Sequence, residues 1–241
     1  MSAPRLRMIA GPNGSGKSTL FDSLAAKSLN LGHVLNPDQL EREIADSRRF
    51  NFAHHNIETD DRTLRSFFLS HNLGNRLPDP NTFGIRDNTL ELYDEIRGGY
   101  FVAVLADFLR RQWLATGQTF TFESVMSSQD KVDLLAQALS LGYRTYVYYV
   151  CTDSPIINRE RVANRVIQGG HPVPPEKIDA RYQRSLSLLP AAVRNSSRAY
   201  LFDNSGTGHR LIAEFEGGTL VAASRELPGW FVNTGLFPHD L

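Results

Sequence analysis

The sequence of 241 residues has a single cysteine, no net formal charge and no long run of apolar residues. A lone cysteine, Cys151, excludes an intrachain disulfide framework and a cysteine metal cluster. It ends the apolar run that starts at Tyr146, which favours a buried thiol over a nucleophile. Basic and acidic residues number 26 each. This balance argues against nucleic acid or an anionic membrane as the main partner, because both select a basic surface.

The chain also lacks the stretch of about 18 apolar residues that a membrane span requires. The first seven residues contain no apolar signal core, so we expect a cytoplasmic protein. With 41% hydrophobic residues in 241, the chain can bury one substantial core. We predict one α/β domain over residues 1–241.

Short apolar strands alternate with amphipathic helices along the chain. Predicted strands cover residues 6–10, 33–35, 119–123, 144–151 and 199–203, and predicted helices cover 18–27, 37–45, 103–115, 130–141, 155–168 and 175–194. This alternation predicts a parallel five-stranded sheet flanked by helices. Residues 212–215 and 219–222, on either side of Gly217-Gly218, predict a C-terminal hairpin.

Two stretches depart from that alternation. Residues 48–99 are rich in Asn, Asp, Arg and His, contain Pro78 and Pro80, and show no clear strand. We interpret them as an insertion of loops and helices at the carboxyl edge of the sheet, where ligands bind in such folds. The tail from 225 to 241, which contains Trp230, receives no predicted place.

The strongest motif follows the first predicted strand and precedes the first predicted helix. It matches the phosphate-binding pattern G-x-x-x-x-G-K-[ST] over Gly11, Pro12, Asn13, Gly14, Ser15, Gly16, Lys17, Ser18 and Thr19. Gly14 and Gly16 let the backbone curl so that N–H groups point at phosphates, and the helix N-terminus adds positive potential. Lys17 reaches the β- and γ-phosphates, and Ser18 supplies a hydroxyl to Mg²⁺. The motif predicts nucleoside triphosphate binding; the alternative is a glycine-rich turn that matches by chance.

A phosphate loop does not separate kinases from switches, so the polar residues at strand ends must decide. Asp38 follows the second predicted strand and is placed to accept the proton of an attacking hydroxyl; the alternative is a helix cap. Glu123 ends the third predicted strand. An ionised glutamate there is costly unless water, metal or substrate meets it. A substrate or Mg²⁺ contact is therefore favoured over a cap.

A third group of charges lies on the predicted helix 155–168. Arg161 and Arg165 are four residues apart and share a face, so both guanidiniums can converge on one anion. Glycines and prolines follow at 169–175 and are typical of a closing lid, which phosphoryl-transfer enzymes use to neutralise developing charge. A solvated helix face is the alternative. Asp153-Ser154-Pro155, by contrast, is typical of a helix cap with proline at the first helical position.

Together these motifs resemble the zeta-toxin-like P-loop kinases, and most closely a broad branch of predicted bacterial ATPases. The resemblance rests on residues 11–19, Asn36-Pro37-Asp38, Phe120-Thr121-Phe122-Glu123-Ser124, Arg161-Val162-Ala163-Asn164-Arg165, Gly169-Gly170-His171-Pro172-Val173-Pro174, Arg181-Tyr182-Gln183-Arg184-Ser185-Leu186 and Phe202-Asp203-Asn204-Ser205-Gly206. These blocks run in the family's order over residues 5 to 215 or so.

The resemblance implies an α/β P-loop kinase fold and ATP with Mg²⁺ as phosphate donor. For the toxins it implies phosphorylation of a hydroxyl of UDP-N-acetylglucosamine, within a toxin–antitoxin system. Carried over by motif, Lys17 is the phosphate lysine and Ser18 the Mg²⁺ ligand. Asp38 is the base, Glu123 with Ser124 contacts the substrate, and Arg161 and Arg165 are lid arginines.

Three departures leave the acceptor open. No arginine follows Glu123 in the run Ser124 to Ser128. The position that the second lid arginine has in those toxins falls near Gly170-His171 here. The insertion 48–99 is also unlike the compact toxins. We expect a phosphotransferase with an alcohol group as acceptor, with a sugar nucleotide first. The alternatives are a nucleotide-dependent switch or ATPase that binds a protein partner, and a kinase of another nucleotide or an antibiotic.

Overall fold

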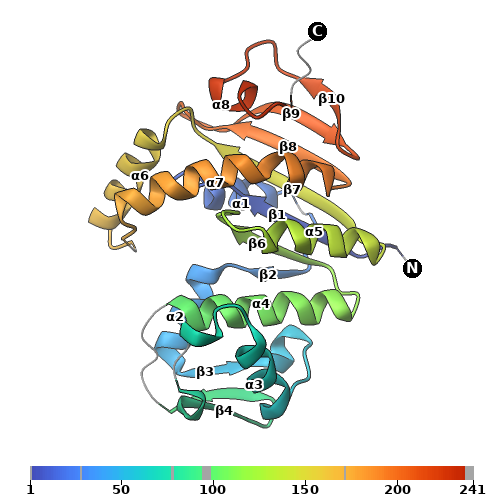
Figure 1. The fold of residues 1–241 in the computed structure, drawn as a ribbon, viewed down its shortest axis with the longest axis vertical. Coiled ribbons are helices and arrows are strands. Elements are labelled where there is room, and N and C mark those ends of the chain that lie inside the picture. Colours follow the sequence, from blue (N-terminus) through green and yellow to red (C-terminus); the bar gives the residue numbers. More distant parts are fainter. Residues whose placement is uncertain (1, 28, 77–78, 94–98, 171, 237–241) are drawn as a thin grey trace. The chain divides into compact units, whose positions relative to one another are not determined.

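In the computed structural model, residues 2–27, 29–76, 79–93, 99–170 and 172–236 are described, and they divide into two units (Figure 1). The first unit contains Met1–Leu31 and Thr121–Leu241, and the second contains Gly32–Phe120. Pro78, His171 and the tail residues 237–241 lie outside the described residues. No helix in the described part of the chain is long and apolar enough to cross a membrane.

The first unit is built on a sheet whose strands run in the order β10-β9-β8-β7-β1-β6. Their bounds are β1 Arg5–Ala10, β6 Phe120–Ser124, β7 Arg144–Cys151, β8 Arg198–Asp203, β9 Arg210–Glu216 and β10 Thr219–Ala223. β1, β7 and β8 are parallel, whereas β9 and β10 are antiparallel to their neighbours. The predicted α/β class is confirmed, and the predicted hairpin extends this sheet.

The hairpin turn explains why two adjacent glycines stand between β9 and β10. Gly217 and Gly218 both have positive φ angles, 54° and 83°. Two-residue hairpins need this left-handed conformation at both positions, where a side chain is unfavourable. The Gly-Gly pair therefore determines where the chain reverses.

Helices cover both faces of this sheet. They are α1 Lys17–Ala25, α5 Asp130–Ser140, α6 Pro155–Ile167, α7 Pro175–Arg194 and the short α8 Gly229–Val232. Successive strand residues point to opposite faces. Tyr148 packs with Leu20 and Leu24 of α1, whereas the Tyr149 hydroxyl lies 3.0 Å from the Ser185 hydroxyl of α7. Figure 1 shows α7 lying across the strands.

The start of α6 follows the predicted capping chemistry. The Ser154 side chain accepts the N–H of Ile156 at 3.2 Å, with Pro155 at the first helical position of α6. The cap predicted at residues 153–155 is therefore confirmed, and Ser154 is the capping residue. α7 begins at Pro175 and continues through Pro190 to Arg194, as its apolar spacing predicts.

Cys151 and two residues of the C-terminal tail are buried in this unit. Cys151 is fully buried, and burial raises the pKa of its thiol to about 12, which fits a structural thiol and not a nucleophile. The tail, which had no predicted place, packs through Trp230 and Phe231, 4% and 0% exposed. The Trp230 indole N–H donates to Asp203 Oδ1 at 3.0 Å, so the tail completes the core beside β8.

The second unit combines three longer helices with a small antiparallel sheet. Its elements are β2 His33–Leu35, α2 Pro37–Ser47, β3 Arg49–Asn51, α3 Asp61–Ser70, β4 Phe83–Arg86, β5 Thr89–Leu92 and α4 Gly99–Ala115, with 3₁₀ turns at Phe52–His55, Gly74–Arg76 and Pro80–Thr82. Strand order in the small sheet is β3-β5-β4.

Loops and helices alone were expected over 48–99, so these three strands correct that expectation. Strands of three or four residues are too short to show a clear alternation. One signal was present: Asp87 and Asn88, with φ angles of 48° and 56°, form the tight turn between β4 and β5. Asn and Asp are the residues that most readily adopt this conformation after glycine.

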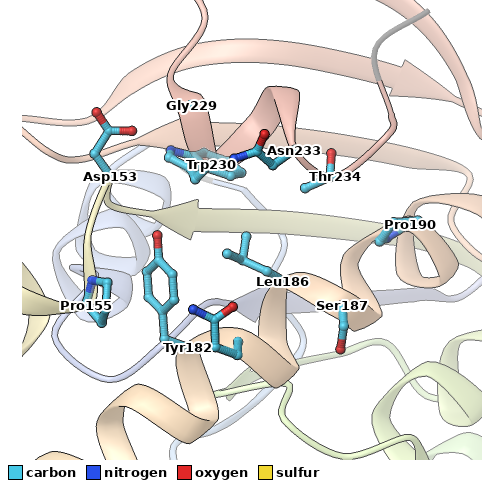
Figure 2. Close-up of a pocket in the computed structure, with 11 residues that line it drawn as sticks. Asp153, Pro155, Tyr182, Leu186, Ser187, Pro190, Gly229, Trp230, Asn233 and Thr234 are labelled. Atoms are coloured by element: carbon cyan, nitrogen blue, oxygen red, sulfur yellow. The ribbon is translucent and has the colours of Figure 1, made fainter.

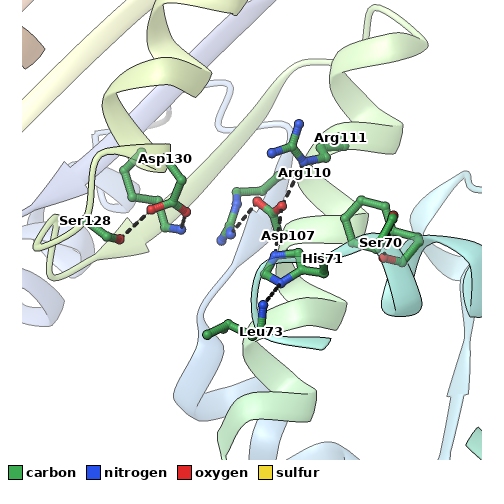
Figure 3. A network of polar contacts seen from close by, with 10 residues as sticks. Ser70, His71, Leu73, Asp107, Arg110, Arg111, Ser128 and Asp130 are labelled. Carbon is green, nitrogen blue, oxygen red and sulfur yellow. Dashed lines mark hydrogen bonds and ion pairs between the residues drawn. The ribbon is translucent and has the colours of Figure 1, made fainter. Parts of the chain in front are cut away.

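A buried polar network ties α3 and its following turn to α4 (Figure 3). Asp107 and Arg110 are 5% and 3% exposed. The Asp107 carboxylate accepts from Arg110 at 3.1 Å and from Arg111 at 2.7 Å, and it lies 3.5 Å from Nε2 of His71. The Leu73 N–H donates to Nδ1 of His71 at 3.1 Å, which orients the other ring nitrogen toward the carboxylate. Removing one member of such a buried network is strongly destabilising.

Candidate functional site

The phosphate loop connects β1 to α1, as the motif requires. Gly14 and Gly16 have φ angles of 76° and 97°. A Cβ added at Gly14 would lie 2.5 Å from the carbonyl oxygen of Asn158, so only glycine fits. Gly16 is the N-cap of α1 and offers no side-chain hydrogen bond. The first N–H groups of α1 therefore remain available to an anion, which the helix N-terminus also favours.

The lysine and serine of the motif have defined partners in the first unit. Lys17 Nζ donates to the carbonyls of Gly11 and Pro12 at 2.9 and 3.0 Å. The Ser18 hydroxyl donates to Glu123 Oε2 at 3.2 Å. The Lys17 ammonium thus lies against the start of the loop, and the residue proposed to bind Mg²⁺ pairs with a carboxylate from β6.

Glu123 and Ser124 end β6 beside the loop. The Gly11 N–H donates to the Ser124 carbonyl at 3.2 Å, which fixes the end of β6 against the start of the loop. The Ser124 hydroxyl accepts the Met126 N–H at 2.9 Å. Ser124, predicted to contact substrate, therefore shapes the turn after β6, whereas Glu123 presents its carboxylate to Ser18.

Four side chains that the sequence analysis did not select brace the loop from three other segments. Asn158 of α6 donates to the Asn13 carbonyl at 2.6 Å, and Arg181 of α7 donates to Asn13 Oδ1 at 3.2 Å. After β8, Asn204 donates to the Ser15 carbonyl at 2.7 Å and His209 Nε2 to the Gly16 carbonyl at 3.0 Å. Asn204 follows β8 directly, so the strand-end rule that selected Asp38 and Glu123 would have found it.

The two predicted lid arginines occupy different positions along α6. Arg161 donates to the Gly206 carbonyl at 3.1 Å, within the segment after β8 that braces the loop. Its other terminal nitrogen, Nη1, is buried with no hydrogen-bond partner among the described residues. Arg165 packs at the end of α6, where a Cβ on Gly170 would lie 2.6 Å from its Cγ. Arg161 is therefore linked to the loop through the segment that contains Asn204 and Gly206.

Asp38 belongs to the second unit and lies in the first turn of α2. The N-cap of this helix is Asn36, whose Oδ1 accepts the N–H groups of Asp38 and Gln39 at 2.9 and 3.2 Å. The alternative interpretation of Asp38 as the capping residue is therefore wrong. Its carboxylate is exposed and has no hydrogen bond or ion pair within the described residues.

Each unit contains a cavity that other residues line. One, of about 550 Å³, is in the first unit (Figure 2). Its lining is Asp153, Pro155, Tyr182, Gln183, Leu186, Ser187, Pro190, Gly229, Trp230, Asn233 and Thr234. The other, of about 530 Å³, is in the second unit beside Asn56 and Gln112. Neither contains a residue of the phosphate loop.

Comparison with known protein families supports the resemblance that the sequence motifs predicted. Residues 99–206 match the model of the zeta toxin family, which confirms the predicted resemblance to zeta-toxin-like P-loop kinases. The match does not include residues 11–19, so the assignment of the phosphate loop depends on its own motif and backbone conformation. A search among curated protein sequences found no significant match.

Two solved structures with TM-scores above 0.5 share the fold at low sequence identity. A crystal structure of AvrRxo1-ORF1:AvrRxo1-ORF2 with ATP has a TM-score of 0.57 at 14% identity, and one with sulphate ions has 0.56 at 13%. Both comparisons cover 91% of this chain and 60% of the other, so the chain spans less than two thirds of those proteins. A structure from the PezAT chromosomal toxin-antitoxin system of Streptococcus pneumoniae has 12% identity, 89% and 72% coverage, and a TM-score of 0.49.

Proposed function

We propose that this zeta-toxin-like protein is an ATP-dependent phosphotransferase that transfers the γ-phosphate to a hydroxyl of a small molecule. The observation that carries the proposal is the phosphate loop between β1 and α1, with Ser18 paired to Glu123 at 3.2 Å. The zeta toxin match over residues 99–206 supports the same reaction class.

The donor side follows from the residues of the first unit. The N–H groups of the loop and of the α1 N-terminus bind the phosphates. Lys17 exchanges its bonds to the Gly11 and Pro12 carbonyls for the β- and γ-phosphates. A hydroxyl and a carboxylate are hard oxygen ligands, so Ser18 and Glu123 fit Mg²⁺ together with phosphate oxygens. When bound, Mg²⁺ neutralises charge on the phosphates.

The pairing with Ser18 bears on the role of Glu123. The family resemblance implies a substrate contact, whereas a carboxylate bonded to the Mg²⁺-binding hydroxyl is placed for the metal. We therefore assign Glu123 to the metal side of the site. The described residues contain no group of three or more His, Cys, Asp or Glu side chains that forms a metal site, and this is compatible with an ion that depends on phosphate oxygens for much of its coordination.

On the acceptor side we propose Asp38 as the base. Its carboxylate is exposed and unpaired among the described residues and does not cap α2, so it is free to accept the proton of a hydroxyl. Arg161 and Arg165 neutralise charge on the transferring group. The acceptor that we propose is a sugar nucleotide of the UDP-N-acetylglucosamine kind, and the partner is an antitoxin; both rest on the family resemblance.

A second candidate is a nucleotide-dependent switch or ATPase that binds a protein. It is favoured by the second unit, which has a core of its own, with Phe52 and Phe108 in edge contact at 5.9 Å and Phe83 and Phe101 at 5.3 Å. A separately packed unit offers a surface for a partner protein, and a switch needs no base.

Incubating the protein with γ-labelled ATP and a small-molecule extract separates the two candidates. The kinase proposal expects label on a small molecule that contains a hydroxyl group. Lys17→Ala should abolish both labelling and ATP binding without unfolding the protein, because Lys17 is outside the core. Lys27→Ala, an exposed lysine after the same helix, is the matched control and should keep both. Hydrolysis of ATP with no labelled product would favour the switch.

A further inference from the structure

We infer that the cavity of the first unit binds a small organic cation, in which an ammonium or guanidinium group is carried by an apolar body. Its volume of about 550 Å³ lies within the range of small-molecule sites. The connection from β7 to α6, the helix α7 and the segment around α8 supply its described walls (Figure 2). These residues belong neither to the phosphate loop nor to the other positions assigned to phosphoryl transfer, so the site is additional to the proposed function.

Aromatic and aliphatic side chains form one part of the wall. Figure 2 shows Tyr182 and Leu186 of α7 pointing toward Trp230. The Tyr182 hydroxyl donates to the Thr152 carbonyl at 2.6 Å, and the Trp230 indole N–H donates to Asp203 Oδ1 at 3.0 Å. Because these polar groups already have partners, the two rings offer apolar surface to an occupant. This part of the cavity suits the apolar body of a ligand.

The charge in the described lining is acidic and comes from Asp153. Its Oδ1 lies 4.0 Å from the position that a Cβ on Gly229 would occupy, and Gly229 also lines the cavity. The Asp153 carboxylate is exposed and has no hydrogen bond or ion pair within the described part of the chain. The other polar side chains of the lining are neutral; they are Gln183, Ser187, Asn233 and Thr234. The lining therefore attracts a cation and repels an anion.

A second carboxylate, that of Asp203, lies behind the wall. It is 7% exposed, and its side-chain donors are the neutral groups of Trp230 and Ser205, at 3.0 and 2.7 Å. The same Ser205 hydroxyl accepts the Asp153 N–H at 2.9 Å, so one side chain connects the two acidic residues. Burying a carboxylate without a cationic partner is costly. A cation in the cavity lowers this cost, which adds to the attraction from Asp153.

The helix α7 supplies a further acceptor at Pro190, which lies inside the helix. Proline has no N–H, so the Leu186 carbonyl lacks the donor that residue 190 would supply in a regular helix. Leu186 and Pro190 both line the cavity. A ligand that matches a carboxylate and such a carbonyl must bring hydrogen-bond donors. Ammonium and guanidinium groups carry three and five N–H donors and no acceptor, so an organic cation fits this lining.

Calorimetric titration with 4-phenylbutylamine, 4-phenylbutanol and 4-phenylbutyrate tests the inference, because the three probes share an apolar body and differ in charge. The amine should bind about tenfold more tightly than the alcohol, since a charged donor makes the stronger hydrogen bond, and the carboxylate should bind most weakly. Asp153→Asn should bring the amine to within about threefold of the alcohol. The matched control is Glu176→Gln, an exposed acid of α7 outside the lining, which should keep the preference. Thermal unfolding checks that each variant is folded.

Leu186→Phe checks that the probes bind in this cavity. The larger side chain narrows the cavity, so this variant should weaken the amine and the alcohol alike. The inference is wrong if the amine does not bind the wild-type protein at millimolar concentration, or if it binds no more tightly than the alcohol or the carboxylate. Amine binding that is unchanged in Asp153→Asn or in Leu186→Phe would also overturn it. Since no titration uses ATP, a negative result leaves the phosphotransferase proposal in place.

Discussion

The phosphate loop in the first unit and the Asp38 segment in the second unit are held in opposite ways. Asn158, Arg181 and Asn204 reach the loop from three segments, with donor–acceptor distances of 2.6, 3.2 and 2.7 Å. Asp38 is exposed, and its N–H donates to the side chain of Asn36, two residues away. The phosphate loop is thus held by tertiary packing, whereas the position of the proposed base depends on one local helix start. Substitutions at the two places should therefore change different properties: turnover at Asp38, and stability together with ATP affinity at the loop.

The largest expected effect is on turnover at Asp38. Asp38→Asn keeps the shape of the side chain and removes its charge. We expect phosphoryl transfer to fall by about a hundredfold or more, the usual contribution of a positioned base, with ATP affinity unchanged. The free energy of unfolding should stay within about 0.5 kcal/mol, because Asn36 is the cap. Initial rates with labelled ATP and urea unfolding are the measurements.

Asn36→Ala is the companion variant for that segment. It removes the cap, so it should cost about 1 kcal/mol of stability and leave the Asp38 carboxylate in place. If Asp38→Asn instead lowered stability while transfer stayed within a few-fold of wild type, Asp38 would be structural and the switch candidate would gain.

A smaller effect, on both stability and binding, is expected at the braced loop. Asn204→Ala removes the donor to the Ser15 carbonyl, and Ser15 is fully buried. An unsatisfied buried carbonyl costs about 1–3 kcal/mol, and ATP affinity should fall with it because the loop loses a support. The control is Asn164→Ala, an exposed asparagine of α6. Calorimetry and chemical unfolding give both quantities. A loss of affinity with no loss of stability would show that Asn204 contacts the nucleotide and does not brace the loop.

The smallest expected effect is a pH dependence confined to the second unit. Burial, followed by the charges of His33 and His54, lowers the pKa of His55 below its ordinary value of 6.5. The unfolded chain therefore binds a proton on His55 that the folded unit does not. Stability from this group is present above pH 6.5 and falls as the pH drops from there toward the lowered folded pKa.

Tryptophan fluorescence can follow this unit separately. Trp113 stacks on His33 at 5.0 Å, and Trp230→Phe leaves it as the single tryptophan of the chain. In that background, the free energy of unfolding measured with urea should decrease as the pH is lowered from about 7.5 to about 5.5. His55→Gln should flatten the dependence, whereas the exposed His54→Gln should flatten it less. An equal loss of the dependence in both variants would contradict the assignment to His55.

Regular elements were largely predictable from the sequence. The bounds of α7 and β7 match because apolar spacing, a starting proline and a strand-ending polar residue are all local signals. The strands β3, β4 and β5 were missed since three or four residues are too few to show a period. Trp230 was left unplaced because its burial against Asp203 depends on a residue 27 positions away.

The sequence by itself determined the phosphate loop, since its glycines, lysine and serine are contiguous and act through backbone geometry that nearest neighbours impose. It also predicted that a helix starts at Pro37, directly before Asp38, as α2 does. Only the tertiary structure decided what holds the loop. Its partners Asn158, Arg181 and Asn204 lie 145, 168 and 189 residues from the atoms that they bind. Polar side chains such as these carry no periodic signal, and their roles exist only after parallel strands and the helices that follow them bring distant segments to one edge of the sheet.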